Sequence, residues 1–287
     1  MSALQTVTSA TPSSRTRSEP WEALCRGAGA AAGALSSLVV PRTCPCGEED
    51  TWLCTDCREL LMAPPQRVET ACDALLLLAD ARVRPRGNDP AGVDLAPLMP
   101  VLALGQYTGA LQRIILAWKN GGALHLAGPI AAGVAPAITQ LTAQQPGDER
   151  LGEDPSRRDP VWLVPVPSTL SARLRRGEAH TAHLTRQLER AGVGRALRLR
   201  ARPSSGQDGH DARERRRRRI AIGTLPAQAR GGRAVIVDDV VTTGSTLRAM
   251  HDALTETGLQ VVGAVVVAAA RIPGPSVHDM LSSPWQD

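Results

Sequence analysis

Aromatic side chains are scarce in this sequence of 287 residues: they make up 2% of it, with no phenylalanine and one tyrosine. Folds that bind single-stranded nucleic acid by stacking bases on exposed rings need several such side chains, so the composition argues against them. Hydrophobic residues nevertheless amount to 43% of the chain. Its core must therefore be built from valine, leucine, isoleucine and alanine.

Long apolar runs are also missing. No stretch of eighteen consecutive apolar residues occurs, so the sequence predicts neither a transmembrane helix nor membrane insertion. Residues 27–40 are apolar and superficially resemble part of a signal peptide, but they lie deep in the chain and are diluted by glycine and serine. We expect a short helix there and a cytoplasmic protein.

Positively charged residues are mostly arginine, which far outnumbers lysine, and the net charge of the chain is +5. This balance suits an anionic ligand such as a phosphate or a nucleic acid, although a general bias toward arginine explains it equally well. Arg215–Arg219 is a run of five arginines. It is either a solvated, mobile loop or an arm that contacts pyrophosphate or single-stranded DNA.

Four of the six cysteines form two close pairs, which favours a metal site in a reducing compartment over a disulfide framework. One pair has the usual C-x2-C spacing of a zinc knuckle, and the other is one residue tighter. We predict a structural Zn²⁺, with uncoordinated thiols as the alternative, and an all-cysteine shell leaves no open position for catalysis. The predicted ligands are Cys44, Cys46, Cys54 and Cys57. We expect Cys25 and Cys72 to be small core residues.

The most informative stretch is residues 234–247, AVIVDDVVTTGSTL. Its β-branched start, Ala234–Val237, fits the inside of a parallel sheet. Asp238 and Asp239 then follow at the carboxyl edge of that strand, where open α/β sheets bind ligands. Small hydroxylated residues and Gly244 come next, and apolar residues at helical spacing after them predict a helix that ends near Gly258.

This layout predicts a particular ligand. Backbone N–H groups at a helix N-terminus, surrounded by hydroxyl groups, can hold a phosphate. Ionised Asp238 and Asp239 only accept hydrogen bonds, so they suit a vicinal diol such as the two hydroxyl groups of a ribose. Together these features favour a ribose 5-phosphate. The alternative is an ordinary βαβ turn with solvated acidic residues.

The remaining chain reads as alternating strands and helices. We expect the strand ends at residues 165 and 237 to lie side by side, a loop at 82–100, and a helix at 123–141 that is interrupted or kinked near Pro129 and Pro136. The other predicted elements are strands at 101–107, 161–168 (ending in a proline-bracketed turn) and 260–269, and helices at 108–119, 178–191 and 247–257. The predicted domains are a disordered tail at 1–20, a zinc module at 21–62, a main domain at 63–272 and a disordered tail at 273–287.

Residues 235–247 resemble the 13-residue signature with which type I phosphoribosyltransferases bind 5-phosphoribosyl 1-pyrophosphate (PRPP). The resemblance implies that Asp238 and Asp239 hold the ribose hydroxyl groups and are the catalytic pair, and that the following loop holds the 5-phosphate. The implied PRPP-binding residues are Asp238, Asp239, Val241, Thr242, Thr243, Gly244, Ser245 and Thr246.

The order of parts over about residues 38–271 resembles the ComF (competence protein F-like) family of these enzymes. The cysteine cluster, Tyr107-x-Gly-x-Leu111 before Lys119, Pro165-Val-Pro167 and the final DD-x2-TTG carry this resemblance. It implies an α/β fold: a type I phosphoribosyltransferase-like parallel sheet flanked by helices, with a small N-terminal zinc ribbon built on four cysteines. The sequence departs from the family at 178–180, where Glu-Ala-His replaces a frequent Asn-Gln, and at the tight first cysteine pair.

The resemblance also implies chemistry. Mg²⁺ would bind with PRPP, and a nitrogen nucleophile would displace pyrophosphate. The candidates for a pyrophosphate clamp are Lys119, Pro167, Ser168, Arg173 and Arg176. We expect His180, His183 and His251 to be surface or capping residues. Two alternatives stay open: a PRPP or nucleotide sensor without turnover, and a single-stranded DNA handling factor linked to DNA uptake. The acceptor is not predicted, and a homodimer is the common arrangement in the resembled fold.

Overall fold

The structure is a computed structural model, and it describes residues 42–82, 92–120, 122–143, 160–167, 180–197, 199, 201–203 and 220–273. The chain divides into two compact units, Met1–Trp52 and Leu53–Asp287. In the first unit, the described residues form a turn closed by a β-bridge between Thr43 and Glu49. The domain boundaries predicted from the sequence stay predictions.

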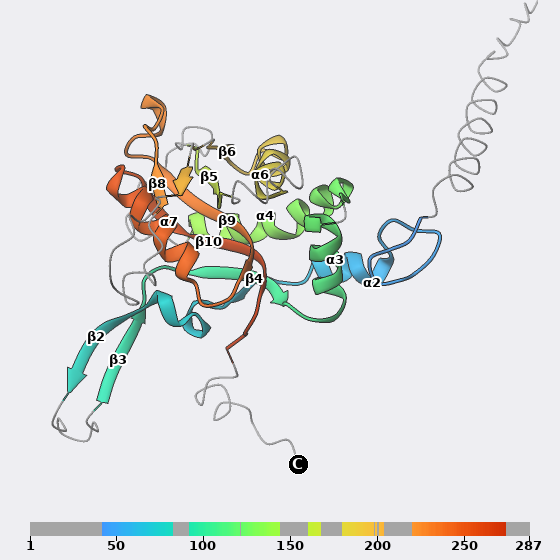
Figure 1. Cartoon of the computed structure of the whole chain (residues 1–287), viewed down its shortest axis with the longest axis horizontal. Helices are drawn as coiled ribbons and strands as arrows, with labels where there is room; N and C mark the ends of the chain where they lie inside the picture. The colour runs from blue at the N-terminus through green and yellow to red at the C-terminus, as the bar shows by residue number, and fades with distance from the viewer. Residues whose placement is uncertain are drawn as a thin grey trace, which may run out of the picture. The chain divides into compact units, whose positions relative to one another are not determined.

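A six-stranded sheet forms the centre of the second unit (Figure 1). All its neighbouring strands are parallel except the short first strand, which is antiparallel to its neighbour. In spatial order the strands are β1 (Gln66–Arg67), β4 (Val101–Gln106), β10 (Gln260–Ala269), β9 (Arg233–Val241), β5 (Trp162–Pro165) and β6 (Arg195–Ala196). The central position of β9 agrees with its sequence, because Ala234–Val237 are completely buried and β-branched residues pack well on both faces of a sheet.

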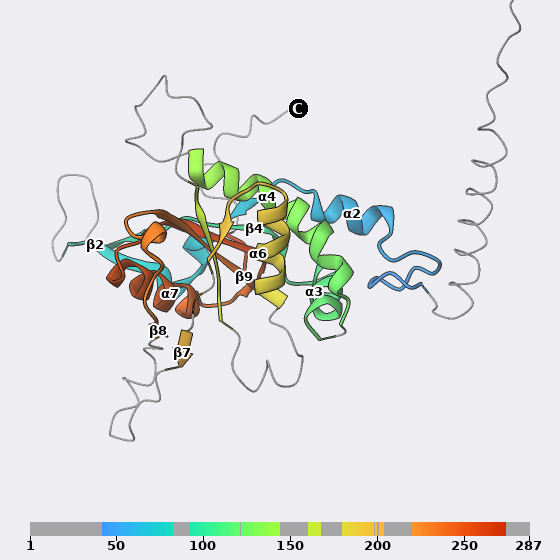
Figure 2. The same cartoon turned by 90° about the horizontal axis from the view of Figure 1, so that it is seen from above.

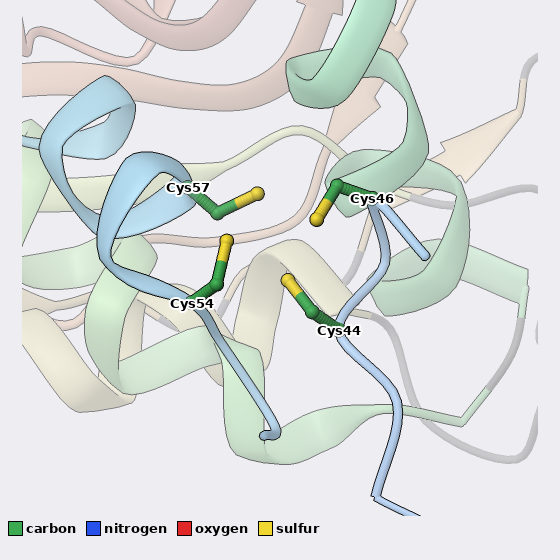
Figure 3. A group of neighbouring side chains, drawn as sticks. All are labelled: Cys44, Cys46, Cys54 and Cys57. Carbon is green, nitrogen blue, oxygen red and sulfur yellow. The ribbon is translucent and has the colours of Figure 1, made fainter. Parts of the chain in front are cut away.

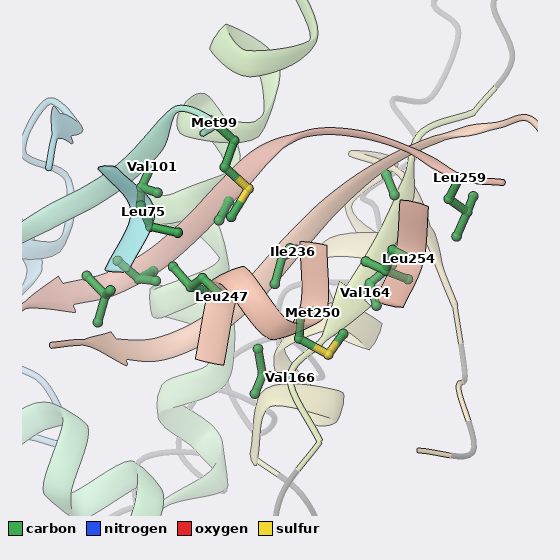
Figure 4. Close-up of a cluster of buried hydrophobic side chains, with 14 of the residues drawn as sticks. Leu75, Met99, Val101, Val164, Val166, Ile236, Leu247, Met250, Leu254 and Leu259 are labelled. Carbon is green, nitrogen blue, oxygen red and sulfur yellow. The ribbon is translucent and has the colours of Figure 1, made fainter. Parts of the chain in front are cut away.

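Helices cover both faces of this sheet. Helix α7 (Ser245–Glu256) lies on one face, where Leu247, Met250 and Leu254 pack against Ile236 of β9 (Figure 4). Helices α4 (Ala127–Ala143) and α6 (His180–Arg190) lie next to each other and apart from α7 (Figure 2). The remaining helices are α2 (Thr55–Leu61), α3 (Gly109–Asn120) and the single turns η1 (Glu69–Ala71), η2 (Asp73–Leu75), η3 (Leu124–Leu126) and η6 (Ala227–Ala229).

A glycine sets how closely α4 packs on the sheet. A Cβ atom on Gly263 of β10 would lie 3.0 Å from Leu141 Cδ2 and 2.9 Å from the carbonyl oxygen of Pro100. Both distances are shorter than ordinary Cβ contacts, so the helix reaches this depth because position 263 has no side chain. Leu124–Ala143 is apolar and long enough to cross a membrane, but half of it is buried against the rest of the unit. Burial of this kind is typical of a core helix.

Most of the expected elements are confirmed, with three corrections. Residues 82–100 are not simply a loop, because β2 (Leu76–Arg82) and β3 (Gly92–Pro97) form an antiparallel hairpin. Helix α4 runs through Pro136 without interruption, and Pro129 lies in its first turn, where a missing N–H is tolerated. Strand β9 extends to Val241, so the two aspartates lie within the strand and not beyond its end. A second small sheet pairs β7 (Ala201–Pro203) with β8 (Ile220–Ile222).

Candidate functional site

The turn between β9 and α7 has the geometry of a phosphate-binding loop. Gly244 takes a left-handed conformation with φ of 79° and directly precedes the first residue of the helix. Thr242 and Thr243 are exposed, and the backbone N–H of Ser245 donates to Thr243 Oγ1 at 3.4 Å. The hydroxyl groups and the helix N-terminus therefore lie at the same point, as the sequence predicts.

Backbone contacts from a distant segment hold this turn in place. The N–H of Ala74 donates to the carbonyl oxygen of Thr243 at 2.9 Å, and Arg248 Nη1 donates to the carbonyl oxygen of Ala74 at 3.0 Å. A Cβ atom on Gly244 would lie only 2.7 Å from Leu75 Cγ and 3.1 Å from Cys72 Cβ. Only glycine fits here, because the position requires both a positive φ and the absence of a side chain.

Cys72 lies under this turn and is a core residue, as expected. Its side chain is buried, and its Sγ donates to the carbonyl oxygen of Val68 at 3.4 Å. Burial, together with the nearby charges of Glu69 and Asp73, raises the pKa of the Cys72 thiol to about 11. A thiol with such a pKa stays protonated at neutral pH, so Cys72 is not a reactive nucleophile.

The two aspartates of β9 have different surroundings. Asp238 is partly exposed, and its Oδ1 accepts the backbone N–H of Asp239 at 2.8 Å. Asp239 is buried, and its Oδ1 accepts the N–H of Val240 at 2.7 Å. The other oxygen of Asp239 is shared by two side chains: it forms an ion pair with Lys119 Nζ and lies 2.9 Å from His180 Nε2.

These surroundings shift the two pKa values in opposite directions. Burial and the adjacent charge of Asp239 raise the pKa of Asp238 well above its ordinary value. Burial also opposes ionisation of Asp239, but the hydrogen bond from His180 and the charge of Lys119 outweigh it and hold the pKa of Asp239 below its usual range. Asp239 is therefore a carboxylate that the protein itself neutralises.

Three elements bring this cluster together. Lys119, the chain's only lysine, is at the end of α3, Asp239 is in β9, and His180 is the first residue of α6. Thr181 Oγ1 ties the start of α6 to the end of β5 by donating to the carbonyl oxygen of Val166 at 3.1 Å. The His180 ring also meets the Trp118 ring edge-on, with the ring centroids 4.9 Å apart.

His180 corrects a prediction. It is buried and bonded to Asp239, whereas the sequence led us to expect a surface or capping residue. The signal that could have found it is its position at the start of the helix that follows β5, since such helices begin near the carboxyl edge of a parallel sheet. His183 contacts Gln187 Nε2 at 3.1 Å, and His251 contacts Asp252 at 3.2 Å. Neither joins the cluster.

The predicted clamp residues are only partly described. Lys119 lies at the acid pair, and Pro167 follows the end of β5, which pairs with β9 as predicted. Ser168, Arg173, Arg176 and the arginine run Arg215–Arg219 lie outside the described residues. The described part of the site thus consists of the acid pair, the loop at 241–246 and Lys119 with His180.

The predicted cysteine cluster forms as a compact group (Figure 3). The four Sγ atoms lie within 4.8 Å of one another, and three of the four residues are buried. A tetrahedral shell with Zn–S bonds of about 2.3 Å places its sulfurs about 3.8 Å apart, so the group can hold such an ion after small adjustments. The tight first pair does not prevent this, because Gly47, with φ of 107°, turns the chain directly after Cys46.

Residues 174–280 match the phosphoribosyl transferase domain family. The match includes Asp238, Asp239 and the whole loop, and it supports the type I phosphoribosyltransferase family and a PRPP-binding function of that type. It does not include Lys119 or the cysteine cluster. No curated protein matches the chain.

Three solved structures are similar to parts of the chain. An adenine phosphoribosyltransferase is 13% identical, with 70% of this chain and 88% of that chain covered and a TM-score of 0.29. The orotate phosphoribosyltransferase from Aeropyrum pernix is 16% identical, with 72% and 82% covered and a TM-score of 0.28. The UMP synthase of Leishmania donovani is 13% identical, with 78% and 34% covered and a TM-score of 0.30.

Proposed function

We propose that this protein binds PRPP at the loop between β9 and α7 and transfers its phosphoribosyl group to a nitrogen acceptor, releasing pyrophosphate. The observation that carries the proposal is the acid pair Asp238–Asp239 near the end of β9, followed after four intervening residues by a left-handed Gly244 at a helix N-terminus, all inside the matched domain. The acid pair can then accept hydrogen bonds from the ribose hydroxyl groups at one end of the ligand, and the loop can bind the phosphate at its other end.

The reaction follows from this placement. The 5-phosphate binds the N–H and hydroxyl groups of residues 242–246, which fixes the sugar with its C1 atom away from the loop. The bond from C1 to the pyrophosphate oxygen breaks, and its electron pair leaves with pyrophosphate. A bond from the acceptor nitrogen to C1 forms, and that nitrogen gives up a proton. Cations at the site, with Lys119 as the described candidate, stabilise the departing pyrophosphate.

The donor set at the acid pair fits a magnesium ion. Asp238 is a partly exposed carboxylate whose pKa is raised by burial and by the charge of Asp239, so a nearby cation would relieve an unfavourable negative charge. Oxygen atoms are the ligands that Mg²⁺ prefers, and Asp238 together with the oxygens of PRPP would supply them. When bound, the ion supplies positive charge beside the pyrophosphate.

The cysteine cluster supports a structural zinc. Four thiolates and no other donor type suit Zn²⁺, and a complete cysteine shell leaves no position for a substrate. We therefore propose that Cys44, Cys46, Cys54 and Cys57 hold Zn²⁺ to stabilise the local fold.

The finer assignment rests on the sequence resemblance. We propose that the chain is a ComF-type protein of the cytoplasm, which acts as a homodimer as is common in that fold. No described residue favours contact with single-stranded DNA, because the arginine run that suggested it lies outside the described part of the chain. A role in DNA uptake rests on the sequence resemblance alone.

Calorimetric titration of PRPP with Mg²⁺ into the full chain tests the proposal. We expect binding near micromolar, and loss of at least about 100-fold in affinity in the double variant Asp238→Asn/Asp239→Asn. Asp252→Asn is the matched control, because Asp252 is an exposed aspartate on α7. Equal binding by the wild type and the double variant, or none by a folded wild type, would contradict the proposed function. Incubation with candidate bases and an assay for released pyrophosphate then separates an enzyme from a sensor.

A further inference from the structure

The side chains of the two aspartates leave β9 on opposite sides of the strand, although their carboxyl groups lie close enough to interact. Successive side chains of a strand alternate between its faces, so Asp238 lies on the same side as Ile236 and Asp239 on the same side as Val237. Ile236 packs against α7, the helix whose N-terminus forms the phosphate loop (Figure 4). Asp239 instead contacts His180 of α6, on the other face. Only Asp238 is on the side of the phosphate loop.

The carboxylate of Asp239 is fully engaged by the protein. One oxygen accepts the Val240 N–H, and the other is shared by Lys119 and His180. The Asp239 side chain is 8% exposed, and that of His180 is 8% exposed. A ribose could reach Asp239 only by displacing the partly buried ion pair with Lys119 and the buried hydrogen bond with His180, which is costly because the Asp239 carboxylate loses its partners.

Asp238 has the opposite character. Among the described residues, its Oδ1 accepts the N–H of Asp239, and the charges that act on it are those of Asp239, which raises its pKa, and of Lys119, which lowers it but is paired with Asp239. Asp238 is also the more exposed of the two aspartates. A partly exposed carboxylate whose nearby cation is paired with another group can accept hydrogen bonds from two neighbouring hydroxyl groups.

We propose that the two acids have different roles. Asp238 alone binds the ribose hydroxyl groups, whereas Asp239 is a counter-ion within the protein that positions Lys119 and His180. This inference rests on the proposed function and refines it, because the signature by itself assigns both acids to the ribose. Lys119 is held by Asp239 at the carboxyl edge of the sheet, where it can meet the pyrophosphate. His180 is a positioning residue that fixes the Asp239 carboxylate from the second side.

Comparing ribose 5-phosphate with 2-deoxyribose 5-phosphate isolates contact with the ribose hydroxyl groups. We define the discrimination ratio as the affinity for the first divided by the affinity for the second, measured by calorimetry with Mg²⁺. The wild type is expected to show a ratio of at least about ten, since a hydrogen bond to a charged group is lost in the deoxy ligand. Asp238→Asn should bring the ratio close to one.

Asp239→Asn should keep the wild-type ratio while PRPP affinity falls about tenfold, because Lys119 loses its anchor. His180→Gln, which keeps an N–H donor, should also keep the ratio. If Asp239→Asn does not fold, the double variant Lys119→Met/Asp239→Asn removes one charge of each sign. It should also keep the wild-type discrimination ratio.

The outcomes are distinguishable. If the discrimination ratio falls close to one in Asp239→Asn, as it should in Asp238→Asn, the proposed difference between the two acids is contradicted. PRPP binding as the function of the protein would still hold. A ratio that is kept in Asp238→Asn contradicts the proposed difference as well. A folded wild type that binds neither ribose 5-phosphate nor PRPP overturns the proposed function, and this inference with it.

Discussion

Asp238 and Asp239 are neighbours in the sequence, but their surroundings shift their pKa values in opposite directions. The partners of Asp239, His180 and Lys119, lower its pKa, while burial and the charge of Asp239 raise the pKa of Asp238 by more than the charge of Lys119 lowers it. A buried carboxylate with two cationic or donor partners stabilises a fold, and a second negative charge next to it destabilises the fold. Residues that bind ligands commonly reduce stability in this way, since they are arranged for the ligand and not for the empty protein.

The stability of single variants should therefore change in opposite directions. At pH 7 we expect Asp238→Asn to stabilise the chain and Asp239→Asn to destabilise it, each by on the order of 1 kcal/mol. The lowered pKa of Asp239 stabilises the fold above the unfolded pKa of about 3.9, and this contribution is lost as pH falls through the folded pKa. The raised pKa of Asp238 favours the fold below about pH 3.9, and this contribution is lost as pH rises through the folded pKa.

Urea denaturation at pH 7 and pH 4 measures both effects. The destabilisation by Asp239→Asn should persist at pH 4, because its folded pKa lies lower still, while the stabilisation by Asp238→Asn should shrink. Asp252→Asn again serves as the control and should stay within about 0.5 kcal/mol of the wild type at both pH values. Destabilisation by Asp238→Asn at pH 7 would contradict this account of the acid pair.

At the scale of elements, the β9–loop–α7 unit depends on a single glycine. Gly244 combines a positive φ with close contacts to Leu75 and Cys72, so the segment that precedes β2 fixes the shape of the phosphate loop. Ala74 adds backbone hydrogen bonds from the same segment. The loop is thus shaped by tertiary contacts as much as by its own sequence.

Gly244→Ala and Gly258→Ala form a matched pair that separates these two causes. Gly258 has a similar φ of 87°, but a Cβ atom there would meet nothing within 4 Å. We expect Gly258→Ala to cost about 1 kcal/mol from backbone strain alone, and Gly244→Ala about 3 kcal/mol because the clash with Leu75 is added. Urea denaturation of both variants measures the difference. Equal costs would mean that Leu75 and Cys72 move aside easily.

The sequence predicted the parts of this unit that depend on neighbouring residues. The β-branched run, the acids, the small residues and the helical spacing of Leu247, Met250 and Leu254 are all local patterns, and the structure confirms the strand, turn and helix. The contacts of Lys119 and His180 with Asp239 could not be predicted in this way. They depend on the order of strands in the sheet, which brings the ends of α3 and α6 to β9.

The β2–β3 hairpin was missed for a related reason. Its residues Leu78, Val93 and Leu95 are exposed, so no buried face imposes the alternating pattern by which strands are recognised. The proline and glycine residues between 83 and 91 then made a loop the simpler interpretation. The pairing of Leu78 with Leu95 is visible only in the structure.

At the scale of the whole molecule, the chain combines a parallel sheet that carries the candidate site with a cysteine cluster that carries no open coordination position. The cluster lies within fourteen residues, from Cys44 to Cys57, in a segment with little apolar core of its own. Such short segments usually need a metal ion to hold their fold. A metal ion bound there would therefore serve local folding and not catalysis.

We expect one equivalent of zinc in the purified protein, measured by plasma mass spectrometry, and its loss in Cys57→Ser. Removing a ligand should lower the stability of the cysteine segment by several kcal/mol, which limited proteolysis would detect as faster cleavage near residues 44–57. Cys72→Ser is the matched control, because Cys72 is buried but outside the cluster. Zinc retained in Cys57→Ser, or lost in Cys72→Ser, would contradict the assignment.

Lys119 has a practical consequence of its own. Because it is the only lysine in the sequence and its side chain is 33% exposed, any amine-directed reagent that modifies a side chain of this protein modifies the partner of Asp239. Coupling the protein to a biosensor surface through lysine amines would thus block the candidate site at Lys119 and Asp239. The same chemistry makes Lys119 a selective handle, at which a single isotopic or fluorescent label would report on the occupancy of the site.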